Sequence, residues 1–413
     1  MSEQPSRLVR RDTRLLYALA VVITTSQGSL ELTLPLNLHA LGYSLPLVGT
    51  AVAALGLGQI LSRIPGGAWY RMDRGRSLTT AALAAFSLTT MGLGLTGSWD
   101  LQAVLAAGHG FAFGLVTTFM LAILIDLRQD QRRAVATMAW YTASISAGYA
   151  IGAPLGALAI ARFGYSPSFW ISGGVGLLAT ALSLALALDA AALRPQPARE
   201  RRRWGGTAVA ALLALPAIIW LATLLVFYLN FVSDLLGAFF PIYAVGIGVP
   251  LALIGLLKSV NSLAATGIRF GAVGLFRYLD PAPINHGAVV AMALAVVGVS
   301  LFSGQLWLLA MFALLGICRG LIRVTTATAV AEEHSHPGNS AGMSSGVYNA
   351  GLDAGSMLAP PLGGALAALV GIPATFRLAA VALPALYYLA WFLIRIRRRP
   401  ASGSQNLPAT KAE

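Results

Sequence analysis

The chain has 413 residues, of which 57% are hydrophobic and 10% are charged, and its formal net charge is +13. A soluble domain carries about 25% charged residues, so this composition excludes a water-soluble globular protein and indicates a polytopic membrane protein. The arginines lie in short segments between apolar runs, as the positive-inside rule predicts. The positive charge therefore does not indicate a nucleic-acid partner.

Apolar runs of about 20 residues recur along the whole chain, and each is long enough to cross a hydrocarbon core about 30 Å thick. They predict an all-α fold of twelve transmembrane helices, with the lipid bilayer as its solvent. The predicted spans are Leu15–Leu38, Leu45–Trp69, Leu78–Thr96, Gln102–Ile125, Ala134–Ala161, Ser168–Leu188, Leu221–Val245, Leu251–Phe276, His286–Phe302, Leu306–Val330, Ala341–Val370 and Ala374–Ile394. The apolar stretch "TAVAALLALPAIIW" is either the start of the seventh helix or a segment in the membrane interface.

With an even number of spans, most of the 28 basic residues lie in segments on one side of the membrane. Only Arg162 and Arg377 lie in segments on the other side. This asymmetry predicts cytoplasmic N- and C-termini, and we expect a monomer in a bacterial-type inner membrane. The predicted parts are an N-terminal tail at 1–14, a six-helix bundle at 15–188, a basic cytoplasmic linker at 189–205, a second six-helix bundle at 206–394 and a basic tail at 395–413.

An internal repeat appears when the chain is shifted by 206 to 207 positions against itself. The segment "AGYAIGAPLGALAIARFG" (147–164) then aligns with "AGSMLAPPLGGALAALVG" (354–371). Further matches pair Gly42 with Gly248, Gly49 with Gly255, Arg63 with Arg269, Gly148 with Gly355, and Pro154 with Pro361. Two pseudo-symmetric six-helix halves follow, an arrangement in which secondary transporters hold substrate between the halves.

Two motifs carry a resemblance to a known family: "GAWYRMDRGRS" after the second span and "GYAIGAPLG" in the fifth. On these motifs the chain resembles the major facilitator superfamily, and in particular its drug:proton antiporter-like branch. Ala106 stands where those antiporters typically carry an arginine. The resemblance implies a central cavity lined by the first, fourth, seventh and tenth helices, and a latch between Asp73 and the start of the eleventh helix.

The resemblance and the spacing together predict a set of gating residues. Glycines at every fourth position of the fifth helix let a neighbouring helix approach closely, and we expect them to permit sliding between the halves. The predicted gate consists of Gly67, Arg71, Asp73, Arg74, Gly75, Arg76, Gly148, Gly152, Pro154 and Gly156.

Ionisable side chains inside a bilayer are costly and usually face a cavity. Four polar pairs have i, i+4 spacing, which places both members on one helix face: Gln27 and Glu31, Asn230 and Asp234, Arg319 and Arg323, and Asn349 and Asp353. They predict a water-filled cleft. The candidates for reversible protonation are Glu31, Asp234 and Asp353; alternatively, Asp353 or Asp234 permanently neutralises Arg319. The candidate substrate contacts are Gln27, His109, Tyr141, Asn230, Lys258, Arg319, Arg323 and Asn349.

The sequence holds no phosphate-cradling loop, no zinc-type cluster and no nucleophile elbow, so we expect neither an enzyme nor a cofactor or bound metal. The prediction is a secondary active transporter that moves a small amphipathic molecule by alternating access, as a proton-coupled, multidrug-type efflux protein driven by the proton gradient. Two alternatives stay open: a proton-coupled symporter or uniporter of an organic anion, and a non-transporting membrane sensor.

Overall fold

The computed structural model describes residues 4–127, 134–188, 215–275, 281–333 and 341–397. The predicted basic linker at 189–205 and the C-terminal tail beyond 397 lie outside these residues. Within them the chain forms twelve α-helices and a short 3-10 turn at Met72–Arg74, with no strand.

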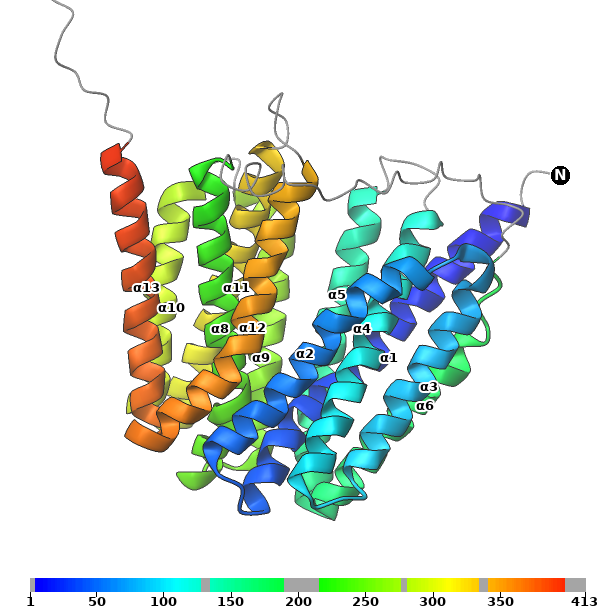
Figure 1. Ribbon diagram of the computed structural model, residues 1–413, viewed down its shortest axis with the longest axis horizontal. Helices are drawn as coiled ribbons and strands as arrows, with labels where there is room; N and C mark the ends of the chain where they lie inside the picture. Colours follow the sequence, from blue (N-terminus) through cyan, green and yellow to red (C-terminus); the bar gives the residue numbers. More distant parts are fainter. Residues whose placement is uncertain (1–3, 128–133, 189–214, 276–280, 334–340, 398–413) are drawn as a thin grey trace, which may run out of the picture.

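The helices fall into two six-helix bundles (Figure 1). The first contains α1 (Gln4–Ala40), α2 (Leu45–Trp69), α3 (Gly75–Leu93), α4 (Trp99–Asp126), α5 (Ala134–Phe163) and α6 (Tyr165–Ser183). The second contains α8 (Ala217–Gly246), α9 (Leu251–Leu275), α10 (Pro281–Leu301), α11 (Gln305–Glu333), α12 (Ala341–Val370) and α13 (Ile372–Arg397). We call the end where α1 begins and α13 ends the terminal face, and the opposite end the distal face. The bundles diverge toward the terminal face and meet near the distal face.

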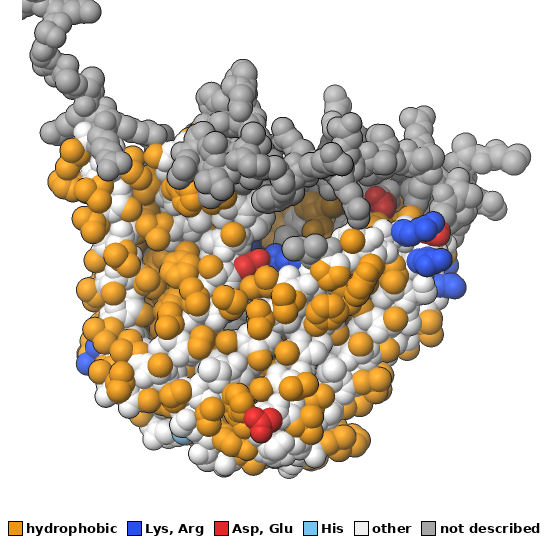
Figure 2. Space-filling view, in the orientation of Figure 1, with side chains coloured by type: hydrophobic (Ala, Val, Ile, Leu, Met, Phe, Trp, Pro, Cys, Tyr) orange, Lys and Arg blue, Asp and Glu red, His pale blue; other side chains and the backbone are white. Residues whose placement is uncertain are grey.

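Ten of these helices are long and apolar enough to cross a membrane; α3 and α6, which pack against each other, are the exceptions among the twelve described. The outer surface fits a lipid environment, because large apolar side chains point outward: Leu306 and Leu369 are each 82% exposed. Figure 2 shows hydrophobic side chains spread over the visible face, with few charged ones among them. The chain is an all-α, multi-pass membrane protein, as its composition predicts.

The internal repeat is visible in the turns of the distal face. Gly42, Gly164, Gly248 and Gly371 follow the ends of α1, α5, α8 and α12, and each has a φ between 81° and 86°. Glycine adopts this left-handed conformation without the steric cost that a Cβ imposes, and it commonly ends a helix. Gly42 matches Gly248, and Gly164 matches Gly371, so the repeat predicted from sequence carries the same backbone conformation in both halves.

Two close backbone contacts, which match each other in the repeat to within one position, join the halves near the distal face. A Cβ at Gly49 of α2 would overlap the carbonyl oxygen of Pro360 on α12, and a Cβ at Gly255 of α9 would lie 2.8 Å from Cα of Pro154 on α5. Around them the halves share a buried core that includes Leu30 of α1 and other apolar residues from both bundles. The halves are therefore held together where α2 crosses α12 and α5 crosses α9.

The glycine stripe on α5 does not lie between the halves, so that expectation was wrong. At Gly148, Gly152 and Gly156 the nearest atoms belong to Thr24, Thr25 and Ser29 of α1, which is in the same bundle. The stripe allows α1 and α5 to pack closely, since a glycine has no side chain to separate the backbones. Pro154, on another face of α5, does meet the opposite half.

The start of the chain also differs from the prediction, because α1 begins at Gln4, within the segment expected to be a tail. Two side chains from this extra part of the helix bond to the segment that follows α6. Arg11 Nη2 donates to the carbonyl oxygen of Ala185 at 2.6 Å, and the backbone N–H of Ala187 donates to Asp12 Oδ1 at 3.3 Å. These contacts extend the helix beyond the apolar run that hydropathy detects.

We expect Gly49→Ala to destabilise the closed distal face, because its methyl group would overlap Pro360. Overpacking of this kind costs about 1–3 kcal/mol. Gly56→Ala is the matched control, since Gly56 lies on the same helix with nothing within 4 Å of its Cβ position. Thermal unfolding in detergent, and the distance between spin labels on the distal ends of α2 and α12, measure the effect. Equal stability of the two variants would contradict the contact.

Candidate functional site

A solvent-accessible carboxyl group marks the region between the halves. Glu31 lies on α1 and is exposed to solvent. Its Oε1 accepts hydrogen bonds from Gln27 Nε2 at 3.2 Å and from the Tyr149 hydroxyl at 3.3 Å. Lys258 Nζ, on α9 of the opposite half, lies 3.5 Å from the backbone oxygen of Glu31. Glu31 and Lys258 therefore lie where the two halves approach each other, and we call this region, to which solvent has access at Glu31, the cleft.

A chain of hydrogen bonds extends from Glu31 into the first bundle. The amide nitrogen of Gln27 donates to Glu31, so the amide oxygen faces His109 and accepts from its Nε2 at 2.7 Å. His109 Nδ1 lies 2.9 Å from the hydroxyl of Thr90 on α3. These hydrogen bonds hold the Gln27 side chain in position beside Glu31.

The structure places His109 and Tyr141 away from the cleft. The His109 ring is fully buried and packs against Phe86 with a centroid distance of 4.3 Å. Tyr141 is 6% exposed and belongs to the buried core of the first bundle. Neither side chain is accessible to a ligand in this conformation, because packed neighbours enclose both. In this conformation His109 is a packed residue that forms hydrogen bonds with Gln27 and Thr90.

Polar residues of α8 and α12 bond to one another in the second bundle. Asn230 Nδ2 donates to the Leu352 carbonyl oxygen at 3.0 Å and lies 3.2 Å from Ser356 Oγ. Asp234, one turn further along α8, has Ser356, Arg319 and Lys258 as its polar neighbours. Asn230 therefore ties α8 to α12, while Asp234 lies in the positive potential of two cations.

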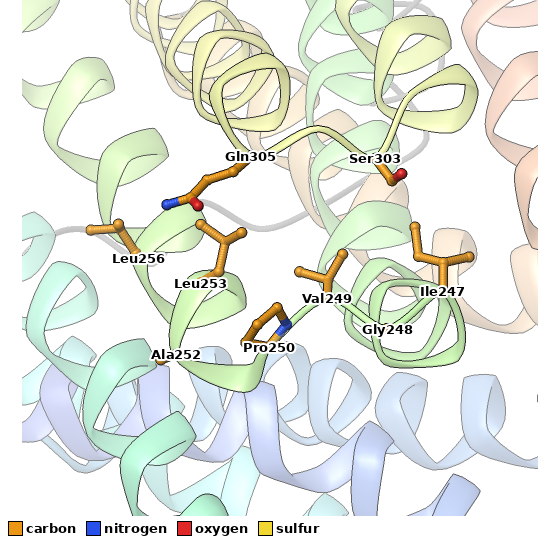
Figure 3. A pocket seen from close by; sticks show the side chains of 9 residues that line it. All are labelled: Ile247, Gly248, Val249, Pro250, Ala252, Leu253, Leu256, Ser303 and Gln305. Atoms are coloured by element: carbon orange, nitrogen blue, oxygen red, sulfur yellow. The ribbon is translucent and has the colours of Figure 1, made fainter.

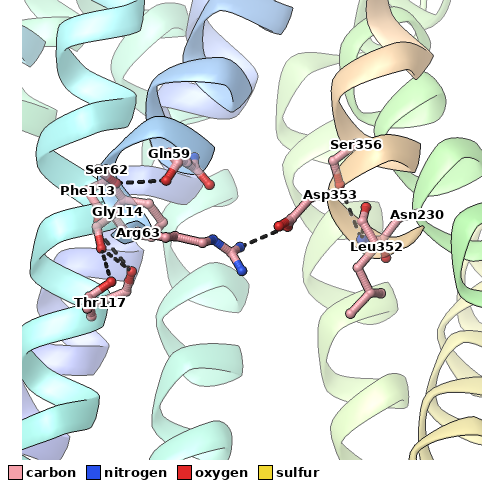
Figure 4. Close-up of polar contacts among 11 residues, drawn as sticks. Gln59, Ser62, Arg63, Phe113, Gly114, Thr117, Asn230, Leu352, Asp353 and Ser356 are labelled. Carbon is pink, nitrogen blue, oxygen red and sulfur yellow. Dashed lines mark hydrogen bonds and ion pairs between the residues drawn. The ribbon is translucent and has the colours of Figure 1, made fainter. Parts of the chain in front are cut away.

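An ion pair bridges the halves nearer the terminal face (Figure 4). Arg63 Nη2 of α2 lies 3.0 Å from Asp353 Oδ1 of α12, and the two side chains are 51% and 22% exposed. The alternative in which Asp353 neutralises Arg319 does not describe this structure, because its partner is Arg63. Sequence reasoning did not assign Arg63 to the site. The signal that was present is its position as a basic residue inside a predicted span, with Arg269 as its repeat counterpart.

Three further arginines gather in the second bundle. Arg269 of α9 lies within electrostatic range of Arg319 and Arg323 of α11. In the described part of the chain, none of the three forms an ion pair with a carboxylate. Arg323 also lies within range of Arg63 and Asp353, so this arginine cluster extends to the bridge between the halves.

The charged groups lie at two depths. With a rise of 1.5 Å per residue, Arg63, Arg269 and Arg323 each lie about 27 Å from the distal end of their helices, whereas Glu31 lies about 14 Å from the distal end of α1. The arginines are thus nearer the terminal face, and Glu31 is nearer the closed distal end. Asn349, on the terminal side of Asp353 along α12, is exposed.

The loop after α2 is tied to its own bundle. The Tyr70 hydroxyl donates to Asp126 Oδ2 of α4 at 2.7 Å, and burial together with this bond raises the pKa of Tyr70, which keeps the donor protonated. Arg71 Nε pairs with Asp73 Oδ1 at 3.2 Å, within the loop. Among the described residues, the ion-pair partner of Asp73 is thus Arg71 of the same loop and not a residue of α12. Among the other predicted gate residues, Gly67 has open space at its Cβ position, Gly75 faces Leu188, and Arg74 and Arg76 are exposed.

A surface pocket at the distal face is a weaker candidate (Figure 3). It lies between the α8–α9 turn and the α10–α11 turn, and its polar side chains are Ser303 and Gln305. No charged residue lines it, and it is separate from the cleft residues described above. The cleft between the halves is therefore the better candidate for a binding site.

Comparisons with known proteins agree with the two-bundle fold. The family model described as "Major Facilitator Superfamily" matches residues 16–352. A bacterial homolog of the human lysosomal transporter Spinster, solved in an inward-facing and unoccupied conformation, is 14% identical with a TM-score of 0.73; the match covers 95% of this chain and 99% of that one. The nucleoside transporter NupG is 12% identical with a TM-score of 0.72, over 93% of this chain and 99% of its own. Among curated proteins, none matches the sequence.

We expect Arg63 and Asp353 to be energetically coupled. Because the pair is partly exposed, the coupling is about 0.2–1 kcal/mol. A double-mutant cycle with Arg63→Ala and Asp353→Ala, followed by thermal unfolding, measures it. The charge-swapped variant Arg63→Glu/Asp353→Arg is expected to recover part of the stability that each single swap loses. Strictly additive effects in the cycle would contradict a direct pair.

Proposed function

Because the chain belongs to the Major Facilitator Superfamily, and is a membrane transporter of a small molecule rather than an enzyme, we propose that it performs proton-coupled efflux of a small amphipathic molecule by alternating access. The single observation that carries the coupling is Glu31, an exposed acid whose backbone oxygen lies 3.5 Å from Lys258 Nζ of the opposite half. We infer that Glu31 is the group that takes up and releases the proton.

In this proposal, protonation of Glu31 changes the attraction between the two halves. A charged Glu31 attracts Lys258 across the cleft, and a protonated Glu31 does not, so the attraction between α1 and α9 depends on the proton. Nearby cations favour the charged carboxylate, while desolvation favours the neutral acid. Opening and closing of the cleft changes both influences, which links proton binding to the movement of the halves. Asp234 is a second candidate, because it shares Lys258 and Arg319 as neighbours.

The distribution of basic residues and the similarity to a solved transporter structure support one orientation in the membrane. The basic residues favour a cytoplasmic terminal face. The structural neighbour related to Spinster was solved in an inward-facing conformation, and the bundles of this chain also diverge at the terminal face. We infer that this structure is the inward-open state of a protein in a bacterial-type inner membrane. The outward direction of transport rests on the resemblance of "GYAIGAPLG" to the antiporter motif.

Transport of an organic anion, by proton symport or by uniport, is a second candidate function. The arginines of the second bundle favour it, because they place uncompensated positive charge at the cleft.

We expect Glu31→Gln to abolish transport driven by a pH gradient while leaving insertion and folding intact. The amide keeps the size and the hydrogen bond to Gln27 but carries no exchangeable charge. Proteoliposomes with an imposed pH gradient and an amphipathic fluorescent dye measure the flux, with an internal pH dye for the proton. Asp100→Asn, at the exposed start of α4, is the matched control. Gradient-driven flux at the wild-type rate in Glu31→Gln would overturn the assignment.

Asp73→Asn is expected to reduce transport and to shift the population toward the open terminal face. Alternating access requires that face to close, and by resemblance Asp73 then contacts the start of α12, where a helix N-terminus favours an acid. Arg71→Gln separates this role from the local Arg71–Asp73 pair. Spin-label distances between α2 and α12 at the terminal face report the shift. Unchanged flux and unchanged distances would contradict this role. The charged loop would then serve only to set the orientation of the helices in the membrane.

A further inference from the structure

We propose that Arg269, Arg319 and Arg323 form a binding site for an oxyanion group, a carboxylate or a phosphate, on the transported molecule. This inference rests on the proposed function in one respect only, which is that the bound molecule is the one that the protein transports. Binding of the oxyanion itself follows from four features of the described residues.

First, the pseudo-symmetry leaves one arginine without its counter-ion. Arg63 of α2 corresponds to Arg269 of α9, and Asp353 of α12 corresponds to Ser146 of α5 in the register that pairs Gly148 with Gly355. Arg63 pairs with Asp353 at 3.0 Å. At the equivalent crossing of α9 and α5 the acid is replaced by a serine, so Arg269 has no matching carboxylate.

Second, Ser146 does not replace the missing partner, because its hydroxyl donates to the Thr142 carbonyl oxygen of its own helix at 3.1 Å. The Nε of Arg269 is buried and has no hydrogen-bond partner in the described structure. A buried donor without a partner loses its hydration and gains nothing in return. An acceptor oxygen from a ligand would satisfy it.

Third, the arginines are arranged to hold one anion together. Arg319 and Arg323 have i, i+4 spacing and share a face of α11, and Arg269 approaches them from α9. Three guanidinium groups in a partly buried site repel one another unless an anion lies among them. A planar fork of N–H donors fits the oxygens of a carboxylate or phosphate in bidentate fashion.

Fourth, the neighbouring acids are already engaged or lie deeper. Asp353, which is within range of Arg323, is paired with Arg63. Glu31 and Asp234 are within range of Arg319. Arg269 and Arg323, about 27 Å from the distal end of their helices, therefore hold the least compensated charge and define the centre of the site.

Equilibrium binding to the purified full chain in nanodiscs, without any ion gradient, tests the site. Benzoate and phenyl phosphate are the anionic probes, and their two titrations show which oxyanion is preferred; benzyl alcohol and benzylamine are the matched neutral and cationic probes. We expect only the two anions to bind. Arg269→Gln and Arg323→Gln are each expected to weaken anion binding about tenfold or more, the effect of one lost charged hydrogen bond. Arg162→Gln, at the exposed end of α5, is the control and should bind as wild type.

A second variant tests the pseudo-symmetry itself. Ser146→Asp supplies the carboxylate that the first half has at Asp353, so it should occupy Arg269 and weaken benzoate binding about tenfold or more. Ser146→Asn has nearly the same shape without the charge, and it should retain wild-type affinity. Size-exclusion profiles and melting temperatures establish that each variant is folded.

The proposal is overturned if benzyl alcohol binds as tightly as benzoate and phenyl phosphate, or if folded Arg269→Gln and Arg323→Gln both bind the anions as wild type does. Because binding is measured without a gradient, loss of proton coupling in the Glu31→Gln experiment does not affect this result. Conversely, failure of anion binding leaves the proton-coupled mechanism standing with a neutral or cationic cargo.

Discussion

The close approach of backbones at the distal face is the constraint on which the rest of the structure depends. Gly49 meets Pro360 and Gly255 meets Pro154, so α2 and α9 each contact a helix of the other half with no side chain between them. The halves are thereby fixed at one end while their other ends diverge (Figure 1). Every polar group of the cleft is placed by its distance from these two crossings.

The charged residues of the cleft differ with their distance from these two crossings. Near the crossings, Lys258 Nζ lies 3.5 Å from the backbone oxygen of Glu31, so under our proposal a single proton on Glu31 changes the attraction between the halves. Further from them, where the bundles diverge, the long side chain of Arg63 reaches Asp353 of the other half. The matching position on the other side lacks the acid, which leaves Arg269 for a ligand under our proposal. Because the repeat has no second acid to match Asp353, Arg63 forms an ion pair between the halves and, under our proposal, Arg269 is available to bind a ligand.

The extent of sequence-based prediction can be judged from particular elements. The bounds of α2 and α12 agree with the predicted spans, because long apolar runs bounded by polar residues define a membrane helix. The start of α1 was missed, because Arg11 and Asp12 are polar residues stabilised by tertiary contacts that hydropathy does not register. The stripe at Gly148, Gly152 and Gly156 was recognised as a close contact, but its partner was assigned to the wrong half, since spacing alone does not name the neighbour.

The sequence by itself determined the number and order of the helices, the repeat and the family, because burial in lipid demands apolar runs and left-handed turns demand glycine. It also identified Glu31, Asp234 and Asp353 as acids to be explained. Only the tertiary structure decided that Asp353 pairs with Arg63, that His109 is enclosed behind Gln27, and that Arg269 has no carboxylate partner among the described residues. Those facts depend on which helices cross and at what height, and long-range packing, rather than local composition, fixes both.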